Sequence, residues 1–519
     1  MTYKHGLIDI GSNTIRLVIY EYKKGRGFKQ IENVKVAARL RNYLSKEGVL
    51  TAKGIYTLLD TLKTFGVITK HQQLPHVTCV ATATIRQAAN AKEVLALVKK
   101  ETGFSIQLLS EYEEAYYGFV AVIHSTSIEE AITIDIGGGS TEVTYFRNRE
   151  LVQYHSFPFG ALSLRLEFVK GNIPTAEERV KIRDFVIRHF HTVPWLLNRQ
   201  VPIVAIGGSA RSMVQLHQGF IHYPLAGLHQ YEMNLADILH VKSAIGSLSY
   251  HNLQKLDRLS KDRADTILPA IEVFQSLYET VNATRFILSR KGLREGVLFK
   301  EASDANIQPM YPDVIQQSFQ EIMEEFEVSK DYVKQLTRTA IMMFQHFREQ
   351  GPVDLKEDDL ALLIKAAQVY DIGEYIDVES SSQHTFYVLA NRTIDGISHR
   401  ERLKLALVSS YKGKSSFRQY VAPFKKWLTK EEQKKVQLLG AVLKIADGLH
   451  ATKRNVVQHI DMKSDENTVT IKLLCTKTFR PEQYQAEKQK KHLEKVVKKI
   501  LFLNLLSFRI TLDRLEYSV

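Results

Sequence analysis

Two short polar segments, each beginning with an aspartate and each lying between apolar stretches, contain the residues best suited to chemistry. The first reads DIGSNT from Asp9 and the second reads DIGGGST from Asp135. Glycine lets a backbone approach a ligand closely, and consecutive N–H groups beside hydroxyl and amide side chains can bind an anion. We therefore expect both segments to bind phosphate. The residues concerned are Asp9, Gly11, Ser12, Asn13 and Thr14 in the first segment and Gly137, Gly138, Gly139, Ser140 and Thr141 in the second.

The two aspartates have a different expected task from the glycines that follow them. A carboxylate repels a bare phosphate, so Asp9 and Asp135 would hold Mg²⁺, directly or through water, while the loops hold the oxyanion. A single tight Gly turn between strands is common and needs no ligand. Asp135 follows Asp9 by 126 residues in a matched copy of the same segment, which makes that explanation much weaker.

The elements that would position these segments have α/β character. Residues 7–21 and 132–146 each read as strand, polar turn and strand, which predicts two hairpins of one design. Helical periodicity lies between them, around 51–65 and 88–100. The pairing resembles the two phosphate-binding hairpins of the superfamily that contains actin, sugar kinases and chaperone ATPases, in which duplicated α/β domains close on a phosphate chain.

A third Gly-rich turn follows the apolar run that begins at Val201. It reads IGGSAR over 206–211 and offers Gly208 and Ser209 to a ligand. In the resemblance it would be the third loop of the superfamily, and the alternative is an ordinary turn from strand to helix.

Composition limits the classes of protein to consider. A chain of 519 residues favours several domains, and a net charge of +13 with a pI of about 9.3 predicts attraction to nucleic acid, anionic lipid or polyphosphate. Two cysteines, Cys79 and Cys475, in apolar strand-like contexts make a disulfide framework or a thiolate metal site implausible. No stretch approaches the roughly 20 apolar residues of a membrane span. We expect a cytoplasmic protein. A nucleic-acid binder would explain the charge but not the paired loops, so we expect it to bind neither nucleic acid nor membrane.

Five motifs in order identify a narrower resemblance. DIGSNTIRL, ATATIRQA, LLSEYEEAYYGF, DIGGGSTE and GLREG resemble the exopolyphosphatase and guanosine pentaphosphate phosphatase family over roughly residues 1–300. The resemblance implies two actin-like (ribonuclease H-like) α/β domains, an all-α HD-like domain and a small α+β C-terminal domain. Their expected bounds are 1–122, 123–305, 306–455 and 456–519. It also implies a homodimer.

The segment from Ser110 predicts an amphipathic helix and presents Glu113 in two possible roles. Ser110 and Glu113 stand three residues apart at its start, the spacing of a capping box. The resemblance instead matches Glu113 to the family's catalytic carboxylate, which would deprotonate the attacking water. Both roles could coexist, because a helix N-terminus favours an ionised carboxylate.

The resemblance assigns further partners to the phosphoryl group. Arg86 would neutralise non-bridging oxygens, and Asp135 with Glu142 would hold Mg²⁺ or another divalent ion, with K⁺ as an activator. Phosphoryl transfer asks mainly for positioning and charge neutralisation, which these groups would supply. Alternatively, Arg86 is an arginine on the surface of a helix, and Glu142 is a strand carboxylate that faces solvent.

The helical part resembles metal-dependent HD phosphohydrolases with an incomplete ligand set. Tyr370 stands in place of the paired His, Asp331-Tyr332 stands where the first ligand His is expected, and Asp371, His384 and Asp447 remain. Such a set should bind a divalent metal poorly. We therefore expect a scaffold rather than a second active centre.

A basic stretch at residues 412–455 holds eleven Lys or Arg against three Asp or Glu. It could guide a long polyphosphate, as basic grooves guide nucleic-acid backbones, or it could be a solvated helical surface. The candidate channel residues are Arg418, Lys425, Lys426, Lys430, Lys434 and Lys435.

The function expected from these features is hydrolysis of terminal phosphates from inorganic polyphosphate. Guanosine pentaphosphate is the alternative substrate, but no aromatic cluster for a base can be assigned. An ATP-dependent kinase would need an adenine site and an acceptor pocket, which the sequence does not display. A non-catalytic polyphosphate-binding regulator is the remaining alternative, and the complete set of Asp9, Glu113, Asp135 and Glu142 argues against it.

Overall fold

The computed structural model describes residues 2–476 and 478–507, and the contacts within it define two compact units. Unit 1 comprises the described residues of Met1–Tyr223, Gly227–Ser318 and Asp395–Ile397. Unit 2 comprises the described residues of Pro224–Ala226, Phe319–Ile394 and Ser398–Val519. The finer division into four domains stays a prediction.

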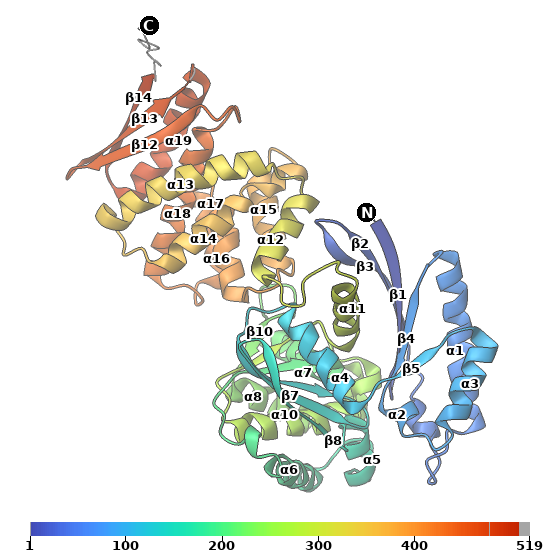
Figure 1. Ribbon diagram of the computed structural model, residues 1–519. Helices are drawn as coiled ribbons and strands as arrows, with labels where there is room; N and C mark the ends of the chain where they lie inside the picture. Colours follow the sequence, from blue (N-terminus) through green and yellow to red (C-terminus); the bar gives the residue numbers. More distant parts are fainter. Residues whose placement is uncertain (1, 477, 508–519) are drawn as a thin grey trace. The chain divides into compact units, whose positions relative to one another are not determined.

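Five strands form the first sheet of unit 1 (Figure 1). They are β1 (Thr2–Ile10), β2 (Ile15–Lys23), β3 (Gly27–Val36), β4 (Val77–Ala81) and β5 (Ile106–Leu108). Their order is β3-β2-β1-β4-β5. The pairs β3–β2 and β2–β1 are antiparallel, and the pairs β1–β4 and β4–β5 are parallel. Helices α1 (Ala52–His71) and α3 (Ala91–Thr102) cover one face through buried residues such as Leu58, Phe65 and Val98. The short helices here are η1 (Leu40–Tyr43) and α2 (Ala83–Arg86).

The second sheet repeats the first with one added strand. Its strands are β6 (Glu130–Ile136), β7 (Thr141–Arg147), β8 (Glu150–Phe157), β9 (Ile203–Ile206), β10 (Tyr231–Met233) and β11 (Phe286–Leu288). The order β8-β7-β6-β9-β11 matches that of the first sheet, and β10 adds to it antiparallel. One core joins this sheet to the helices around it, which include α5 (Ala161–Phe168), α6 (Ala176–His191), α7 (Gly207–Phe220), α8 (Leu235–Gly246) and α10 (Ile267–Val281). The short helices are η2 (Pro194–Leu196), α9 (Tyr250–Lys255) and η3 (Lys261–Arg263).

Strand register shows that the two predicted hairpins are equivalent. Asp9 lies opposite Arg16 in the β1–β2 pair, and Asp135 lies opposite Glu142 in the β6–β7 pair. Each hairpin then closes through four residues, 11–14 in the first and 137–140 in the second. The prediction of two copies of one hairpin is therefore confirmed, and the two aspartates occupy matching places.

Two helices lie between the sheets of unit 1. Helix α4 (Glu111–Ile123) buries Phe119 and Val120 against the second sheet, while α11 (Leu293–Asp304) buries Val297 against the first. The helices also pack on each other, and a Cβ added at Gly296 would lie 1.8 Å from the carbonyl oxygen of Tyr117. Only glycine permits this approach, which explains the second glycine of the GLREG motif.

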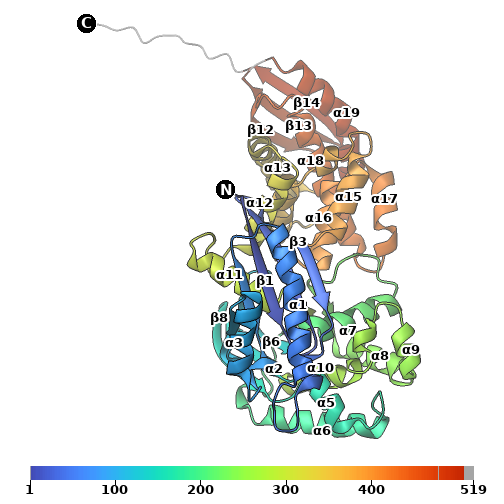
Figure 2. The same cartoon turned by 90° about the vertical axis from the view of Figure 1, so that its right-hand side faces the viewer.

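Unit 2 consists of helices followed by a small sheet (Figure 2). Helix α12 (Val314–Glu325) contains the boundary between the units. The helices that follow are α13 (Lys330–Gln350), α14 (Glu357–Gln368), η4 (Ile372–Tyr375), α15 (Ser381–Asn391), α16 (His399–Ser409), α17 (Lys414–Val421), η5 (Ala422–Phe424) and α18 (Lys430–Gly448). Strands β12 (Val457–Ser464), β13 (Thr468–Cys475) and β14 (Ile500–Ser507) form the sheet, and α19 (Arg480–Val497) packs against β14 and α18. Among the described residues, no helix has the length and apolar character that crossing a membrane requires.

Candidate active site

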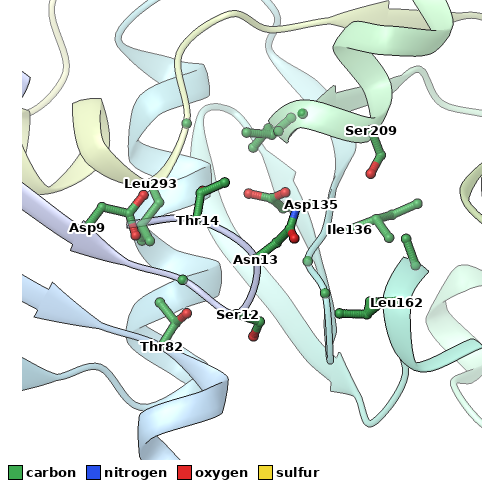
Figure 3. Close-up of a pocket in the computed structure, with 18 of the residues that line it drawn as sticks. Asp9, Ser12, Asn13, Thr14, Thr82, Asp135, Ile136, Leu162, Ser209 and Leu293 are labelled. Atoms are coloured by element: carbon green, nitrogen blue, oxygen red, sulfur yellow. The ribbon is translucent and has the colours of Figure 1, made fainter. Parts of the chain in front are cut away.

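A cleft in unit 1 brings together the two hairpin loops and the third Gly turn (Figure 3). Its volume is about 190 Å³. Asp9, Asn13 and Thr14 come from the first hairpin, Asp135 from the second, and Ser209 from the start of α7. Most of the predicted phosphate-binding residues therefore line one space. Those that line it are Asp9, Gly11, Ser12, Asn13, Thr14, Gly137, Gly138, Ser140, Gly208 and Ser209.

The first loop is closed by its own backbone and held by neighbouring segments. The N–H of Gly11 donates to the carbonyl of Thr14 at 3.0 Å, and the N–H of Arg39 donates to the carbonyl of Asn13 at 2.9 Å. Thr84 donates its hydroxyl to Ser12 Oγ at 2.7 Å, and Ser12 is buried. The loop is thus preorganised, since its shape does not depend on a ligand.

The second loop is closed in the same way and is fastened to helix α5. Gly137 N–H donates to the Ser140 carbonyl at 2.9 Å, while the N–H groups of Ala161 and Leu162 donate to the carbonyls of Gly137 and Gly138. The first N–H groups of α5 therefore bind the loop itself. A Cβ at Gly160 would lie 2.5 Å from the Gly137 carbonyl oxygen, so only glycine fits there.

Two predicted residues of this segment lie outside the cleft lining. Thr141 is fully buried and donates its hydroxyl to the carbonyl of Phe159 at 2.7 Å. Gly139 faces the guanidinium of Arg41, which a Cβ would approach to 3.6 Å. Both residues shape the loop rather than present groups to the cleft.

The third turn packs directly on the second aspartate. Gly207 has φ +84°, and a Cβ there would lie 2.3 Å from Asp135 Oδ1. A Cβ at Gly208 would meet Arg263 Nη2 at 1.9 Å, and Arg263 donates to Ser209 Oγ at 3.3 Å. The glycines are therefore required by close packing around the carboxylate and the guanidinium.

Both aspartates are buried carboxyl groups in a crowded electrostatic environment. Asp9 accepts from Arg294 Nη1 at 3.2 Å. Burial raises the pKa of Asp9, and the charges of Arg294 and Arg16 oppose that rise. Burial, together with the charge of Asp9, raises the pKa of Asp135 to about 6. The pair therefore favours binding of a cation or a proton.

Arginines supply most of the positive charge in the cleft, and sequence reasoning identified none of them. Burial and the neighbouring Arg294 and Arg290 lower the pKa of Arg211 to about 10. Buried Nε atoms of Arg16 and Arg294 have no hydrogen-bond partner among the described residues. Unpaired buried donors in a cleft are suited to an anionic ligand. Six arginines line the cleft, namely Arg16, Arg39, Arg211, Arg263, Arg290 and Arg294.

Helix α4 places its two neighbouring glutamates in different environments. Glu113 forms the capping box, accepting from the N–H and hydroxyl of Ser110 at 2.7 and 2.8 Å. The capping role considered for Glu113 is thus confirmed. Glu114 lines the cleft, whereas Glu113 is not among the lining residues.

Glu114 is the carboxylate that Arg86 holds. Arg86 Nη1 donates to Glu114 Oε2 at 3.0 Å and to the Leu109 carbonyl at 2.7 Å, so Arg86 supports the glutamate from outside the cleft lining. Burial raises the pKa of Glu114 to about 7, opposed by Arg86 and reinforced by Asp135. Such a group is poised to exchange protons near neutral pH.

Glu142 lies in the core behind the cleft. It is 4% exposed, is absent from the cleft lining, and accepts from Ser156 Oγ at 3.2 Å. Burial first, and then the charges of Glu114 and Asp135, raise the pKa of Glu142 well above its ordinary value. Two carboxyl groups that act on each other rarely ionise together, so the Glu114–Glu142 pair favours holding a proton.

A divalent ion fits the oxygen groups at the cleft, although no protein site holds it alone. Among the residues that the structure describes, no group of three or more His, Cys, Asp or Glu side chains is arranged to hold a metal. Mg²⁺ commonly takes one or two carboxylates and completes its coordination with water and substrate phosphates. Asp9 and Asp135, buried with raised pKa values, match that donor set.

In unit 2, two of the residues compared above with an HD ligand set are in contact, and among the described residues no metal-holding group is found there. Tyr332 donates its hydroxyl to Asp447 Oδ1 at 2.6 Å. Burial raises the pKa of Asp371 and of Asp447. The Tyr332 phenol therefore donates a hydrogen bond to the Asp447 carboxylate, which in a metal site would bind the ion.

The predicted channel residues of unit 2 differ in how far their charges are exposed to bind an anion. Lys435 is largely buried and pairs with Asp359 Oδ2 at 3.0 Å, so its charge is already neutralised. The others are exposed, namely Arg418, Lys425, Lys426, Lys430 and Lys434.

Comparison with known proteins places these features in a family context. The sequence model of the Ppx/GppA phosphatase family matches residues 18–305, and that of Ppx/GppA phosphatase domain III matches residues 314–495. A guanosine-5'-triphosphate,3'-diphosphate pyrophosphatase of Pseudoalteromonas translucida is 24% identical over 415 residues, which is 78% of this chain and 80% of that protein.

Solved structures resemble about three-fifths of the chain. The crystal structure of the Aquifex aeolicus family member has a TM-score of 0.52 and 28% identity, covering 59% of this chain and 99% of that one. An exopolyphosphatase from Cytophaga hutchinsonii has a TM-score of 0.53 and 21% identity, covering 60% of this chain and all of that one. The second likeness shows the fold alone.

Proposed function

Because the chain belongs to the Ppx/GppA phosphatase family, we propose that its cleft hydrolyses the terminal phosphoanhydride bond of inorganic polyphosphate. One observation carries the proposal. Glu114 shares a single cleft with the Asp9 and Asp135 loops and with six arginines. A proton acceptor, two loops with phosphate-binding character and a surplus of cations are what in-line phosphoryl transfer to water requires.

The proposed general base is Glu114 rather than Glu113. Glu113 Oε2 accepts two hydrogen bonds from Ser110, and Glu113 is not among the residues that line the cleft. Glu114 faces the cleft and is fixed from behind by Arg86. It takes a proton from water, the water oxygen bonds to the terminal phosphorus, and the bond to the bridging oxygen breaks.

The surrounding residues bind and orient the substrate in this proposal. Donors of Arg294 and Arg16 would bind non-bridging oxygens, and charge that develops on the leaving phosphate would be stabilised by the remaining arginines. Asn13 and Thr14 present polar side chains to the same space. Fixed dipoles and charges of this kind lower the barrier because they need no rearrangement during reaction.

Asp9 and Asp135 would hold Mg²⁺ in the proposed site. The ion would neutralise phosphate charge and help to align the terminal group. Arg294 pairs with Asp9 and keeps that carboxylate oriented toward the cleft. A role for K⁺ stays a prediction.

Two features favour inorganic polyphosphate as substrate. Among the described residues that line the cleft, none is aromatic, so no ring is placed to stack on a base. The five exposed candidate channel residues of the 412–455 stretch carry positive charges that would attract a longer anion.

Guanosine pentaphosphate is the second candidate substrate, and the curated relative favours it. That relative carries the corresponding pyrophosphatase name and matches 78% of this chain. Its terminal phosphate could enter the cleft while the nucleoside stays outside.

We further propose that unit 2 is a scaffold without a second active centre, because the phenol of Tyr332 occupies Asp447. The expected homodimer and the cytoplasmic location stay predictions.

Phosphate release from the full chain tests the proposal. We would compare long-chain polyphosphate with guanosine pentaphosphate, each with and without Mg²⁺, for wild type and Glu114→Gln. We expect higher kcat/KM on polyphosphate and a loss of ~10²-fold or more in Glu114→Gln. Higher kcat/KM on guanosine pentaphosphate would support the second candidate. Equal release by wild type and Glu114→Gln would contradict the assigned base.

A further inference from the structure

A three-residue segment, Asp395–Ile397, belongs to unit 1 although its neighbours along the chain belong to unit 2. The chain leaves α15 of unit 2, contributes these residues to unit 1, and continues into α16. Asp395 lies in the stretch that matches domain III of the family, and the first family model ends at residue 305. The segment is therefore a contribution from the helical part of the chain to the unit that holds the cleft.

Backbone contacts fix the segment in unit 1. The N–H of Gly396 donates to the Ser125 carbonyl at 3.2 Å, and Ser127 donates its hydroxyl to the Gly396 carbonyl at 2.8 Å. Gly396 has φ +86°, and a Cβ there would lie 2.7 Å from Ile315 Cγ1. Because only glycine suits this conformation and this space, the position of Asp395 is closely determined.

The Asp395 carboxylate pairs with Lys291 and lies close to His229, and both residues belong to unit 1. Lys291 Nζ lies 2.5 Å from Asp395 Oδ2, and His229 Nε2 lies 3.3 Å from Asp395 Oδ1. The side chains of Asp395 and His229 are 16% and 1% exposed, so water screens these contacts weakly. The Lys291–Asp395 ion pair is partly buried, with side chains 29% and 16% exposed, so removing one partner leaves the other charge poorly solvated.

His229 extends the network to the backbone beside Lys291. Its Nε2 also contacts the Ser125 carbonyl at 2.8 Å, and a carbonyl can only accept, so Nε2 carries the hydrogen. Its Nδ1 is then the acceptor for the N–H of Arg290, at 3.2 Å. Burial lowers the pKa of His229, which agrees with a neutral ring.

The segment held in this way, Ser289–Gly292, leads directly into the cleft. Arg290 and Arg294 line the cleft, and Arg294 binds Asp9. Ser289 donates its hydroxyl to the Lys291 carbonyl at 2.8 Å, which stiffens the turn between β11 and α11. Asp395 therefore holds Lys291, which follows Arg290 in the chain, and His229 beside it accepts the Arg290 N–H, so these contacts fix the backbone that leads to Arg294.

We propose that Asp395 is a positioning residue for the cleft, holding Arg290 and Arg294 where they bind the phosphate chain. The kinetic test of this inference rests on the proposed function. The binding test does not, because it measures tripolyphosphate binding without hydrolysis. A displacement of about 1 Å in a positioning group can cost ~10²-fold in rate. Asp395 itself touches no substrate in this proposal and acts through the arginines.

The first experiment measures kinetics of the full chain carrying Asp395→Asn, Asp395→Glu or Lys291→Met. We expect Asp395→Asn and Lys291→Met to lower kcat/KM by about 10-fold to 100-fold and Asp395→Glu to recover part of the loss. The matched control is Glu272→Gln, which breaks the buried Lys242–Glu272 pair at 2.7 Å outside the cleft lining. We expect the control to lower Tm with little change in kcat/KM. Equal kinetic losses in Asp395→Asn and Glu272→Gln would overturn the proposal.

The second experiment measures binding of tripolyphosphate by calorimetry in the Glu114→Gln background, where hydrolysis is suppressed. We expect Asp395→Asn to weaken binding by about tenfold when Arg290 and Arg294 are present. In a chain that also carries Arg290→Gln and Arg294→Gln, we expect Asp395→Asn to add little. An equal loss in both backgrounds would show a purely structural role and would overturn the proposal. If wild type hydrolyses no phosphoanhydride, the proposed function fails while this binding test still decides the role of Asp395.

Discussion

Arg294 Nη1 meets Asp9 Oδ2 at 3.2 Å, although 285 residues separate them in the sequence. Asp9 belongs to β1 of the first sheet, and Arg294 is in the first turn of α11, after the last strand of the second. The contact therefore joins the two halves of unit 1 between two residues that line the cleft. It also leaves Arg294 Nε without a partner among the described residues, so part of the guanidinium is available to a ligand.

Replacing Arg294 by glutamine should remove both functions of the guanidinium. The charge that opposes the raised pKa of Asp9 is lost, and so is one donor for the phosphate chain. We expect phosphate release to fall ~10²-fold to 10³-fold. Arg285→Gln is the matched control, because Arg285 forms an exposed ion pair with Glu232 at 3.1 Å. Comparable activity of the two variants would contradict a role for Arg294 in binding phosphate.

Substitutions of the two neighbouring glutamates of α4 should have different effects, one on stability and the other on hydrolysis. Glu113→Ala removes the capping box and should lower the free energy of unfolding by ~1 kcal/mol while leaving most activity. Glu114→Gln should keep the cap and lose most hydrolysis. Urea unfolding and phosphate release would be measured on both variants. Loss of activity in Glu113→Ala with normal activity in Glu114→Gln would reverse the assignment.

The hairpins were predictable because their signals are local. Apolar runs on either side of Asp-Ile-Gly predict strand, turn and strand, and register places Asp9 and Asp135 in matching positions. The third Gly turn was also visible in the sequence. Its packing against Asp135 depends on the parallel pairing of β6 and β9, which no local pattern specifies.

The cleft arginines, and the glutamate of α4 that lines the cleft, were not predictable from local signals. Arg263 and Arg294 reach the cleft from distant parts of the chain, and a single arginine carries no mark of its final neighbours. The sequence showed two adjacent glutamates at the start of α4, about 100° apart around the helix axis. Which of them faces the cleft depends on how α4 packs on the second sheet, and the structure selects Glu114.

Stability should fall as pH rises through the range where the buried carboxyl groups ionise. The folded-state pKa is about 7 for Glu114 and about 6 for Asp135, both above the ordinary values. At these two groups the folded protein therefore binds more protons than the unfolded chain between about pH 4 and 7. The loss of stability caused by ionising these two buried carboxyl groups is absent below that range and complete above it. We expect Glu114→Gln to gain on the order of 2 kcal/mol relative to wild type between pH 4.5 and 8. Thermal unfolding across that range would measure it, and parallel Tm curves for the two proteins would contradict the shifted pKa.

Gly207 tests whether the third turn positions Asp135. Gly207→Ala should strain a backbone at φ +84° and force Asp135 Oδ1 away, because a Cβ would lie 2.3 Å from it. We expect a loss of stability of ~1–3 kcal/mol and a large loss of phosphate release. Gly103→Ala is a matched control, because Gly103 has φ +79° with nothing within 4 Å of the added Cβ. If both variants lost activity equally, backbone strain alone would explain the effect and the contact with Asp135 would not matter.

The exposed lysines after α17 should act on long anions only. Lys425→Gln with Lys426→Gln removes two exposed charges of unit 2, whereas Lys435→Gln removes a charge that Asp359 already neutralises at 3.0 Å. Counterion release makes the salt dependence of binding follow the number of phosphate contacts, at ~0.7 per contact for a single strand. We therefore expect the double variant to weaken long-chain polyphosphate binding and flatten its salt dependence by about one unit or more, while tripolyphosphate hydrolysis stays unchanged. Lys435→Gln should alter neither slope nor affinity. Equal effects of the double variant on tripolyphosphate and on long chains would place these lysines outside a substrate channel and support a solvated helical surface.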